Sequence, residues 1–493
     1  MRDYKKLKSG SDIRGTALGG EVDLTDKAAG DIADAFAAWL EERLGKKPLK
    51  IAVGHDSRLS AERLKKAVLD RLIMAGVRVY GCGLCSTPAM YMMTRYNETD
   101  CDAAIMITAS HHPKDKNGLK FFVKSGGLEG ADIARILELA ESGASVENAG
   151  GALERGDYLG LYCNDLIGKV RGATGRTTPL EGLKIAVDAG NGAGGFFAER
   201  VLEPLGADIS GSQFLEPDGN FPNHVPNPED TAAMRSISER VKAAGADLGI
   251  IFDTDVDRAA IVSRDGEEIN RNKLIALISA ILLEEEKGCT VVTDSVTSEG
   301  LREFIEARGG VHHRFKRGYR NVINEAVRLN KAGQNAPLAI ETSGHAALRE
   351  NYFLDDGAYL VTRILIKMSQ LKAEGRELAG LIAGLKVPSE EAEARLKLEC
   401  GNWQEVGKAV IDKLAAYAKQ NLVIATANYE GVRATVSQAQ GWFLARMSVH
   451  DPIMVVNVES DVKGGVKNIA KLLLEALSEF KSKINLEQLK TIN

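Results

Sequence analysis

Three aspartates at alternate positions follow an apolar run, residues 248–252, that we expect to form a buried strand. They are Asp253, Asp255 and Asp257. Because alternate residues of an extended segment point to one side, the three carboxylates should lie close together. Oxygen ligands of this kind suit Mg²⁺, which keeps coordination positions for phosphate or water. A solvated acidic turn is the alternative, whereas an EF-hand fits worse because Arg258 stands where its loop needs glycine.

A second motif places a serine at the exit of a strand. Residues 103–107 are all apolar, which predicts a buried strand, and the sequence Thr-Ala-Ser-His-His-Pro follows at 108–113. Ligands of open α/β sheets bind beyond the carboxyl ends of strands, and Pro113 prevents simple continuation of the strand, so we expect Ser110 on a loop. The serine could instead cap a following helix. These residues alone leave both interpretations open.

A third apolar run, residues 338–340, leads into Glu-Thr-Ser-Gly-His at 341–345. Glu341, Ser343 and His345 offer an acid, a hydroxyl and an imidazole around a glycine that lets the backbone approach a ligand. Recognition of a polyol needs such groups. A helix start capped by Thr342 or Ser343 is the alternative, and both interpretations could hold together.

Basic residues stand at loop positions near these motifs, namely Arg14, Lys120, Arg258 and Arg446. Arginine can pair bidentately with phosphate, whereas lysine acts as a point charge and can also move protons. Taken singly, each is more often a surface charge. Their proximity to the other motifs makes them candidates for phosphate binding.

The elements that position these loops form an internal repeat. A short strand, a polar turn, a helix and a second strand start at residue 49 and again at 183, with second strands at 76–80 and 206–209, and a looser third copy starts at 290. Each copy also contains one of the three apolar runs described above. If the copies are homologous folds, the three loops are equivalent and could converge on one cleft. Beyond about residue 386, several strands lie between an early and a late helix.

We therefore expect an α/β fold with three similar mixed α/β domains in α/β/α layers and a smaller C-terminal α+β domain. The expected boundaries are 1–155 for the domain with the serine loop, 156–260 for the metal loop, 261–385 for the sugar-binding loop and 386–493 for the C-terminal domain. A chain of 493 residues is too long for one core, which agrees with this division.

Composition excludes several classes of function. With 63 basic and 68 acidic residues, the net charge of −5 gives no broad footprint for nucleic acid. The N-terminus lacks an apolar core of signal-peptide type, and the sequence contains no run of about 18 apolar residues that would span a membrane. We therefore expect a soluble cytoplasmic protein without a membrane partner. Of the six cysteines, Cys82 and Cys85 could form a redox couple or half of a zinc site, but no second pair accompanies them. We expect both to be small buried residues.

Together these motifs resemble the α-D-phosphohexomutases, which include phosphoglucomutases and phosphomannomutases. The loop 108–120 is similar to the family's active-serine loop, 12–15 to its N-terminal motif, 253–258 to its metal loop and 341–345 to its sugar-binding loop. Residues 217–229 are similar to another stretch common in the family. The five matches occur in the family's order along almost the whole chain.

The resemblance implies an isomerase of carbohydrate metabolism that interconverts hexose 1-phosphate and hexose 6-phosphate. Phospho-Ser110 would give its phosphoryl group to the sugar phosphate, and a hexose 1,6-bisphosphate, which also serves as activator, would reorient before the other phosphate returns to the serine. Mg²⁺ would bind one phosphoserine oxygen and the three aspartates. By analogy, proton transfer and charge support would come from Arg14, His111, Lys120 and His345, and substrate binding from Arg258, Glu341, Ser343, Arg446, Ser448 and His450. The partner is thus a small sugar phosphate, with the protein a monomer or homodimer.

The chain departs from the family's usual pattern at several positions. Its phosphate loop usually reads Arg-Pro-Ser-Gly-Thr-Glu-Pro, whereas residues 446–452 read Arg-Met-Ser-Val-His-Asp-Pro. Valine lacks the backbone freedom of glycine, and His450 offers a ring nitrogen in place of a hydroxyl. His112 stands where asparagine is usual. Two alternatives stay open, a sugar-phosphate-binding regulatory protein without normal catalysis and a phosphatase of haloacid dehalogenase type with Asp253 as nucleophile.

Overall fold

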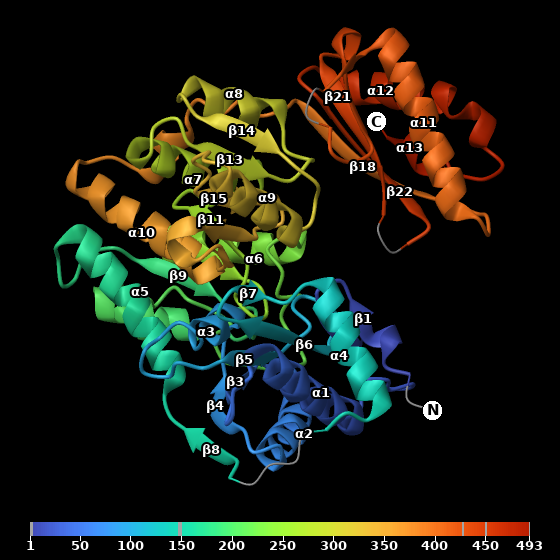
Figure 1. Ribbon diagram of the computed structural model, residues 1–493. Coiled ribbons are helices and arrows are strands. Elements are labelled where there is room, and N and C mark those ends of the chain that lie inside the picture. Colours follow the sequence, from blue (N-terminus) through green and yellow to red (C-terminus); the bar gives the residue numbers. More distant parts are fainter. Residues whose placement is uncertain (1–2, 146–149, 426–427, 449–450, 493) are drawn as a thin grey trace. The chain divides into compact units, whose positions relative to one another are not determined.

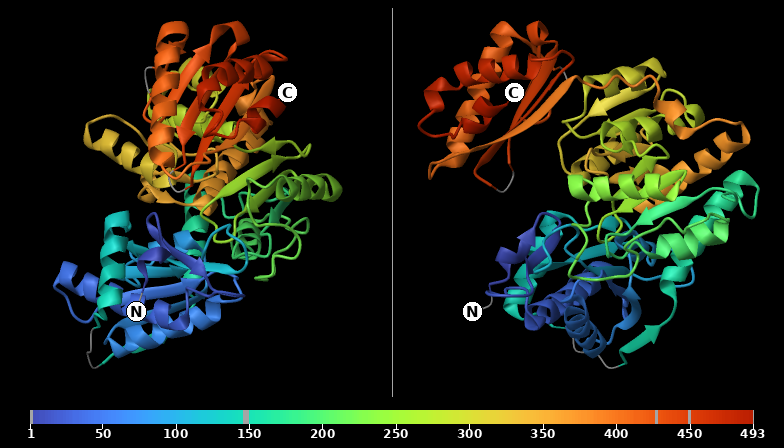
Figure 2. Two further views of the ribbon diagram at one scale, coloured as in Figure 1. Left: turned by 90° about the vertical axis from the view of Figure 1, so that its right-hand side faces the viewer. Right: turned by 180° about the vertical axis from the view of Figure 1, so that it is seen from behind.

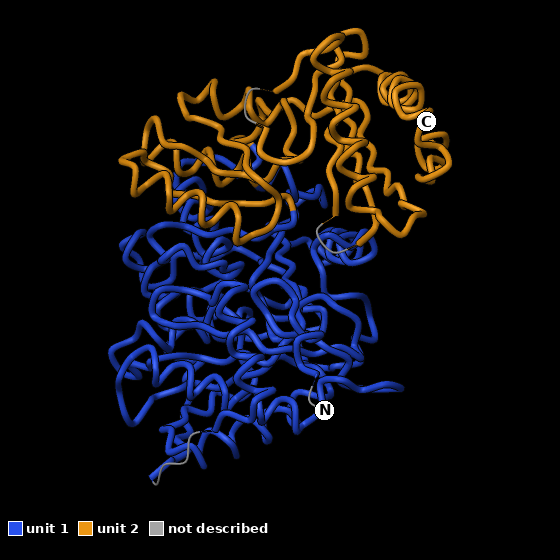
Figure 3. Tube along the Cα trace, turned by 45° about the vertical axis from the view of Figure 1, so that its right-hand side comes forward, with its two compact units in different colours: residues 1–274, 343–379 blue, residues 275–342, 380–493 orange. Residues whose placement is uncertain are grey.

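The computed structural model describes residues 3–145, 150–425, 428–448 and 451–492 (Figure 1). The chain divides into two compact units, which are described separately (Figure 3). The first unit contains residues 1–274 and 343–379, and the second contains residues 275–342 and 380–493.

The N-terminal part of the first unit is built around one mixed sheet. It contains β1 (Lys8–Ser9), β2 (Asp12–Thr16), β3 (Lys50–His55), β4 (Arg78–Leu84), β5 (Ala103–Ile107), β6 (Lys116–Val123) and β8 (Ala152–Arg155) in the order β1-β2-β6-β5-β3-β4-β8, with β7 (Gly126–Gly127) paired to β6. Strands β3, β4, β5 and β8 are parallel, whereas β6 runs antiparallel to β5. This arrangement brings the carboxyl end of β5 beside the start of β6, and the Ser110 loop connects the two.

Helices cover both faces of this sheet. Helices α1 (Asp26–Leu44), α2 (Ala61–Met74) and α4 (Gly130–Ser142) share one apolar core with alternate residues of β3 and β5 (Figure 1). The short helix α3 (Thr87–Met92) packs on the opposite face, where Met90 lies against Gly54. Because successive side chains of a strand point to opposite faces and both faces are covered, the sequences of these strands are almost wholly apolar.

A second sheet of the first unit holds the aspartate loop. It contains β9 (Ile185–Asp188), β10 (Leu248–Phe252), β11 (Ala259–Ser263) and β12 (Glu268–Ile269), in the order β12-β11-β10-β9. Strands β9 and β10 are parallel, and β10 and β11 form an antiparallel pair in which Phe252 faces Ala259. This unit also contains α5 (Tyr158–Thr174), α6 (Thr231–Ala244), β16 (Ala346–Leu348), β17 (Leu354–Asp355) and α10 (Gly357–Ala373).

The strand expected at 206–209 does not form. Only one residue pairs there, as an isolated bridge between Asp208 and Lys184. The Asp208 side chain accepts a hydrogen bond of 2.9 Å from the Ser210 amide, which turns the chain after a single bridging residue. The helical segment before it is also irregular, with a π-helix at Ala198–Leu202 followed by a 3₁₀ turn at Glu203–Leu205.

The second unit contains a parallel sheet and a separate antiparallel sheet. The parallel strands are β13 (Thr290–Thr293), β14 (Val311–Arg314) and β15 (Leu338–Ile340), with β13 in the middle and helices α8 (Glu299–Ala307) and α9 (Tyr319–Lys331) beside them. Helix α7 (Asn272–Glu285) begins in the first unit and ends in the second.

The C-terminal sheet is antiparallel and has helices on one face only (Figure 2). Its strands are β18 (Glu390–Lys397), β19 (Val423–Ile424), β20 (Val432–Val436), β21 (Gly441–Met447) and β22 (Ile453–Ser460), in the order β18-β22-β21-β20-β19. Helices α11 (Trp403–Asn421), α12 (Gly465–Ala476) and α13 (Glu487–Thr491) cover the sheet. Strand β18 precedes the early helix and was not expected from the sequence.

Neither a membrane span nor a cysteine site is evident in the part of the chain that the structure describes. No helix there is both long and apolar enough to cross a bilayer. Cys82 and Cys85 are free and buried, and burial raises the pKa of both thiols, to about 12 for Cys85. The neutral thiol is therefore favoured, which agrees with the expectation that these residues fill space in the core.

One buried ion pair of the first unit should make stability depend on pH. The Nε2 atom of His224 lies 3.0 Å from Asp188 Oδ1, and its Nδ1 lies 2.9 Å from the Val225 carbonyl oxygen. Burial alone would lower the pKa of His224, but the hydrogen bond to Asp188 and its charge raise it above the ordinary value. The pair therefore stabilises the fold fully below the pKa of an unfolded histidine, and this contribution is lost as the pH rises through the higher folded pKa.

We expect His224→Asn to lower the melting temperature most at acidic pH. The difference in melting temperature from the unsubstituted protein should reach a few degrees at about pH 6, since about 1 kcal/mol corresponds to roughly 2–4 °C in domains of about 150–250 residues. This difference should shrink toward about pH 8. Thermal unfolding followed by circular dichroism across this range measures it. A difference that is constant with pH would contradict the protonated pair.

Candidate active site

Ser110 lies on the short loop between β5 and β6. Residues 108–115 of this loop are all described, and no helix begins among them. Its φ of 51° is in the left-handed region, which non-glycine residues seldom adopt. The Ser110 amide donates to Thr108 Oγ1 over 2.9 Å, and its hydroxyl donates to Asp253 Oδ2 over 3.1 Å. His111 Nδ1 lies 3.3 Å from the same hydroxyl. The helix-cap interpretation is therefore wrong, and the serine points instead toward the aspartate loop.

The aspartate loop is a tight turn between β10 and β11, not the extended segment expected from the sequence. Val256 has a φ of 70°, so the chain reverses here and an alternation of faces does not apply. The turn still brings the three carboxylates together, because one oxygen of each lies within 4.8 Å of the others. All three aspartates are buried. A solvated surface turn is thereby excluded.

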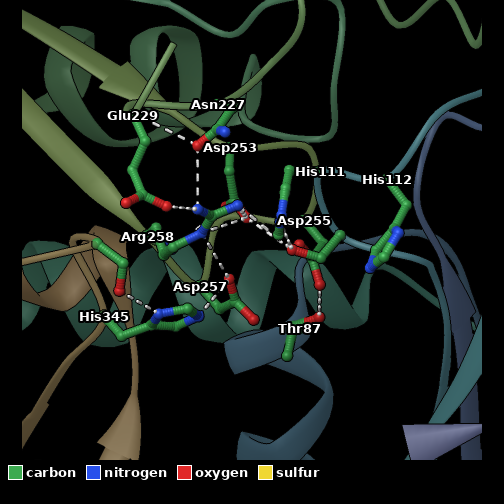
Figure 4. A network of polar contacts seen from close by, with 12 residues as sticks. Thr87, His111, His112, Asn227, Glu229, Asp253, Asp255, Asp257, Arg258 and His345 are labelled. Carbon is green, nitrogen blue, oxygen red and sulfur yellow. Dashed lines mark hydrogen bonds and ion pairs between the residues drawn. The ribbon is translucent and has the colours of Figure 1, made fainter. Parts of the chain in front are cut away.

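Two cations and a hydroxyl lie beside the buried carboxylates, and Figure 4 shows two of these groups, Arg258 and Thr87. Lys120 Nζ lies 2.9 Å from Asp257 Oδ2, and Thr87 donates to Asp255 Oδ2 over 2.5 Å. Burial raises the pKa of Asp253 and Asp255. Burial acts in the same direction on Asp257, but its neighbours, Lys120 foremost and Arg258 among the others, together outweigh burial and hold the pKa of Asp257 below its usual range. These contacts therefore compensate only part of the electrostatic repulsion among the three carboxylates.

The donor set of this cluster fits a hard divalent cation. Asp255 Oδ1 and Asp257 Oδ1 are buried and have no hydrogen-bond partner among the described residues. A buried carboxylate oxygen without a partner is costly, and coordination to a cation removes that cost. Three carboxylate oxygens suit Mg²⁺ and leave positions for water or phosphate. The three aspartates therefore fit the requirements of a bound cation.

Arg258 is a buried guanidinium that joins the aspartate loop to Ser110. Its Nη2 lies 3.0 Å from Asp253 Oδ2 and 3.5 Å from Ser110 Oγ. Its Nη1 donates to Asn227 Oδ1 over 3.0 Å and lies 3.5 Å from Glu229 Oε2 (Figure 4). The contacts to Asn227 and Glu229 were not predicted, although both residues end the stretch 217–229 that resembles the family.

His345 lies on the other side of the same cluster. Its Nδ1 is 2.9 Å from Ser343 Oγ, and its Nε2 is 3.8 Å from Asp257 Oδ1 and 3.6 Å from Asp355 Oδ2. Burial lowers the pKa of His345 to about 3, so its ring is neutral at physiological pH. The expected helix start at Ser343 does not form, since β16 follows directly.

Arg14 completes the set of predicted catalytic residues in the first unit. It lies on β2, opposite Gly118 of β6, and its Nη2 is 3.0 Å from Asp12 Oδ2. The same Asp12 oxygen is 3.9 Å from Lys120 Nζ. Arg14 and Lys120 are therefore linked through one carboxylate on adjacent strands.

The remaining predicted substrate-binding residues belong to the second unit. Glu341 accepts a hydrogen bond of 2.6 Å from the Gly318 amide. Arg446 is the residue before the end of β21, and its buried Nε has no hydrogen-bond partner among the described residues. Burial lowers the pKa of Arg446, and Glu430 opposes that shift. Ser448 is described, whereas His450 lies outside the described residues.

A buried arginine fastens the C-terminal sheet to the parallel sheet of the same unit. Arg433 of β20 donates to the carbonyl oxygens of Ser295 and Thr297 over 2.8 and 3.1 Å, and lies 3.2 Å from Glu299 Oε1. Its guanidinium carbon is 3.4 Å from the centroid of the Trp442 ring. Arg446 lies on the strand next to β20, so this contact helps fix its position.

Comparison with known proteins identifies the family. Family models for phosphoglucomutase/phosphomannomutase alpha/beta/alpha domains I, II and III match residues 5–147, 161–266 and 270–385. The chain belongs to the phosphoglucomutase/phosphomannomutase family of mutases. This membership confirms the resemblance drawn from the five motifs, and it confirms the predicted fold class of three α/β/α domains with an additional C-terminal domain.

Relatives in this family match most of the chain. A phosphoglucomutase of Neisseria gonorrhoeae is 32% identical over 460 residues, which are 93% of this chain and 94% of the relative. A phosphomannomutase/phosphoglucomutase of Pseudomonas putida is 30% identical over 443 residues, 88% of this chain and 89% of the relative. A crystal structure of a family protein from Burkholderia thailandensis superposes with a TM-score of 0.81 at 28% identity, covering 98% of this chain and 99% of the other.

We expect Asp255→Asn to weaken Mg²⁺ binding at least about tenfold, because an anionic ligand becomes neutral. Titration calorimetry with MgCl₂ measures the affinity directly. Asp265→Asn is a matched control, since Asp265 is an exposed carboxylate on the turn after β11. Equal affinity in the two variants would contradict the metal assignment.

Proposed function

We propose that this mutase interconverts hexose 1-phosphates and hexose 6-phosphates through phosphorylated Ser110. Phospho-Ser110 transfers its phosphoryl group to the free hydroxyl of the sugar phosphate, which forms hexose 1,6-bisphosphate. After the bisphosphate reorients, its other phosphoryl group returns to Ser110. Each transfer breaks one phosphorus–oxygen bond and forms another, so the cycle consumes no phosphate.

The observation that supports this proposal best is the setting of the Ser110 hydroxyl. It lies 3.1 Å from Asp253 of the buried carboxylate cluster and 3.5 Å from the guanidinium of Arg258. Phosphoryl transfer depends mainly on positioning and on neutralising charge at the phosphoryl oxygens. A serine between a cation-binding cluster and a fixed positive charge suits that requirement.

The metal belongs to the same proposal. Asp253, Asp255 and Asp257, together with one oxygen of phospho-Ser110, would hold Mg²⁺, which when bound neutralises charge on the phosphoryl group. Arg258 adds a positive charge that its contacts with Asn227 and Asp253 keep in place.

Proton transfer is assigned to groups around the reacting hydroxyls. An attacking sugar hydroxyl must lose its proton, and a departing oxygen must regain one. Lys120, His345, His111 and Arg14 all belong to the first unit and lie around the carboxylate cluster or the serine loop. They supply the donors and acceptors, with no single residue assigned as base or acid.

Substrate recognition is assigned to the loops of the third and fourth domains. Glu341 and Ser343 would bind sugar hydroxyls, and Arg446, Ser448 and His450 the phosphate that is not being transferred. The buried Nε of Arg446 supports this role, because a phosphate oxygen would satisfy it. The division into domains at 1–155, 156–260, 261–385 and 386–493, the cytoplasmic location and the monomeric or dimeric state stay predictions.

A phosphatase with Asp253 as nucleophile is favoured less. Asp253 Oδ2 already accepts the Ser110 hydroxyl at 3.1 Å and lies 3.0 Å from Arg258 Nη2. A carboxylate engaged in this way is held as a ligand and charge partner. A regulatory protein without normal catalysis would bind sugar phosphates but fail the assays that follow.

We expect purified protein incubated with glucose 1,6-bisphosphate to retain one phosphoryl group on Ser110. Intact-mass and peptide analysis detect this phosphoryl group. Ser110→Ala should abolish the modification, and it should also abolish conversion of glucose 1-phosphate to glucose 6-phosphate and of mannose 1-phosphate to mannose 6-phosphate. Ser142→Ala serves as a control for removal of a serine elsewhere in the unit, since Ser142 is exposed at the end of α4. An active enzyme that never carries phosphate on Ser110 would refute the mechanism.

We expect Arg446→Ala to raise KM for the sugar phosphate about 10- to 100-fold, because a hydrogen bond to a charged group contributes about 1.5–3 kcal/mol. Steady-state kinetics measure the change. Arg395→Ala is the matched control, since Arg395 is an exposed arginine of β18 whose guanidinium pairs with Glu393. If the two variants have the same KM, Arg446 does not bind the substrate phosphate.

A further inference from the structure

Arg58 is a buried guanidinium that binds the backbone of the Ser110 loop, and only 2% of the residue is exposed. Its Nη1 and Nη2 atoms each donate to two carbonyl oxygens, which belong to Ser110 (2.5 Å), His112 (2.5 Å), Pro113 (2.7 Å) and Lys116 (2.9 Å). Its Nε lies 3.2 Å from Asp56 Oδ2. A guanidinium has five N–H donors, and here the four on Nη1 and Nη2 bind carbonyl oxygens, whereas Nε pairs with Asp56 by charge and makes no hydrogen bond to a described residue.

Asp56 and Thr108 complete this contact from the other side of Ser110. Asp56 accepts hydrogen bonds of 3.0 Å from the Arg58 amide and 2.7 Å from Thr108 Oγ1. Thr108 Oγ1 in turn accepts the Ser110 amide over 2.9 Å. Both peptide groups of Ser110 are therefore held, the N–H by Thr108 and the carbonyl by Arg58. This explains how the left-handed backbone of a non-glycine residue is kept.

The segment 217–229 covers the guanidinium. The ring centroid of Phe221 lies 5.6 Å from the guanidinium carbon of Arg58. A Cβ at Gly219 would lie 2.4 Å from the Leu59 amide nitrogen, so only glycine permits this close approach to the chain beside Arg58. Burial under this segment removes competing water, which strengthens hydrogen bonds to the carbonyl oxygens.

The direction of these carbonyl groups determines where the loop's amides point. A trans peptide is planar, with its N–H opposite to its C=O. Since the Ser110 carbonyl points to Arg58, the His111 N–H points away from it. That N–H donates to no partner among the described residues. A free amide next to Ser110 is a suitable donor for a phosphoryl oxygen.

We propose that Arg58 is a positioning residue for phosphoryl transfer: by binding four carbonyl oxygens of the Ser110 loop, it turns the His111 amide outward and holds Ser110 in its left-handed conformation. The inference rests on the proposed function of Ser110. Arg58 touches no reacting atom and acts only through the loop. It therefore affects the rate of transfer and not the binding of the sugar.

The proposal predicts a specific pattern for Arg58→Ala. Because a misplacement of about 1 Å at a reacting group can reduce the rate about 100-fold, kcat should fall by about this factor while KM stays within about twofold. Guanidinium chloride at millimolar, non-denaturing concentrations should restore part of kcat by occupying the vacated space. Arg58→Lys should not restore it, since an ammonium has three donors and lacks the planar fork. Arg63→Ala is the control, because Arg63 lies on α2 and pairs with Asp26 at the surface.

A second pair of variants keeps the test valid if Arg58→Ala does not fold. Thr108→Val removes the acceptor for the Ser110 amide, so it should also lower kcat at unchanged KM, and Thr108→Ser, which keeps a hydroxyl, should retain more activity than Thr108→Val. An unchanged kcat in Arg58→Ala, a loss confined to KM, or equal activity of the two Thr108 variants would each overturn the proposal.

The rate of Ser110 phosphorylation by glucose 1,6-bisphosphate separates this inference from the proposed function. Intact mass measured over time should show slow phosphorylation of Arg58→Ala and fast phosphorylation of the unsubstituted protein. If the unsubstituted protein never gains phosphate, the proposed function fails. If both proteins gain it at the same rate, the proposed function holds and the role of Arg58 is wrong.

Discussion

Three carboxylates buried in one turn impose the constraint on which the site depends. Burying like charges is unfavourable unless cations or hydrogen-bond donors compensate them. Arg258 lies 3.0 Å from Asp253, and Lys120 lies 2.9 Å from Asp257, so two fixed cations face three anions and a negative charge is left for a bound cation. Each fixed cation has further partners, Asn227 for Arg258 and Asp12 for Lys120. One electrostatic requirement thus ties β6, the 253–258 turn and the 217–229 segment together.

The sequence predicted those parts of the fold that local patterns record. Wholly apolar runs such as 103–107 and 248–252 mark strands covered on both faces, and the polar residues directly after them mark the loops of the site. Strand β18 was missed because charged residues alternate with its core-facing Ala394 and Leu396. The prediction of a strand at 206–209 was wrong. The strand does not form because the Asp208 side chain accepts a hydrogen bond from the Ser210 amide and turns the backbone.

The candidate site was predictable in its residue types but not in its geometry. A run of alternating aspartates suggested an extended segment, whereas Val256 adopts a left-handed conformation and the carboxylates meet across a turn. Thr87 lies far from Asp255 in the sequence, and Asn227 lies far from Arg258, so each pair meets only through tertiary packing and no spacing rule identifies it. For Ser110, the sequence predicted the position directly after a strand, but it did not predict the left-handed backbone conformation.

Arg58 recognises main-chain oxygens, and this has a consequence for variation within the loop. Carbonyl groups are the same whatever side chain the residue carries, so the hydrogen bonds from Arg58 to residues 110–116 do not involve the side chains at 112 or 114. Substitutions at these two positions can change the side chains that the loop presents while the acceptors of Arg58 remain. Histidine in place of asparagine at position 112 is a change of this kind, and loops anchored by their backbone can diversify in this way while the reacting group keeps its place.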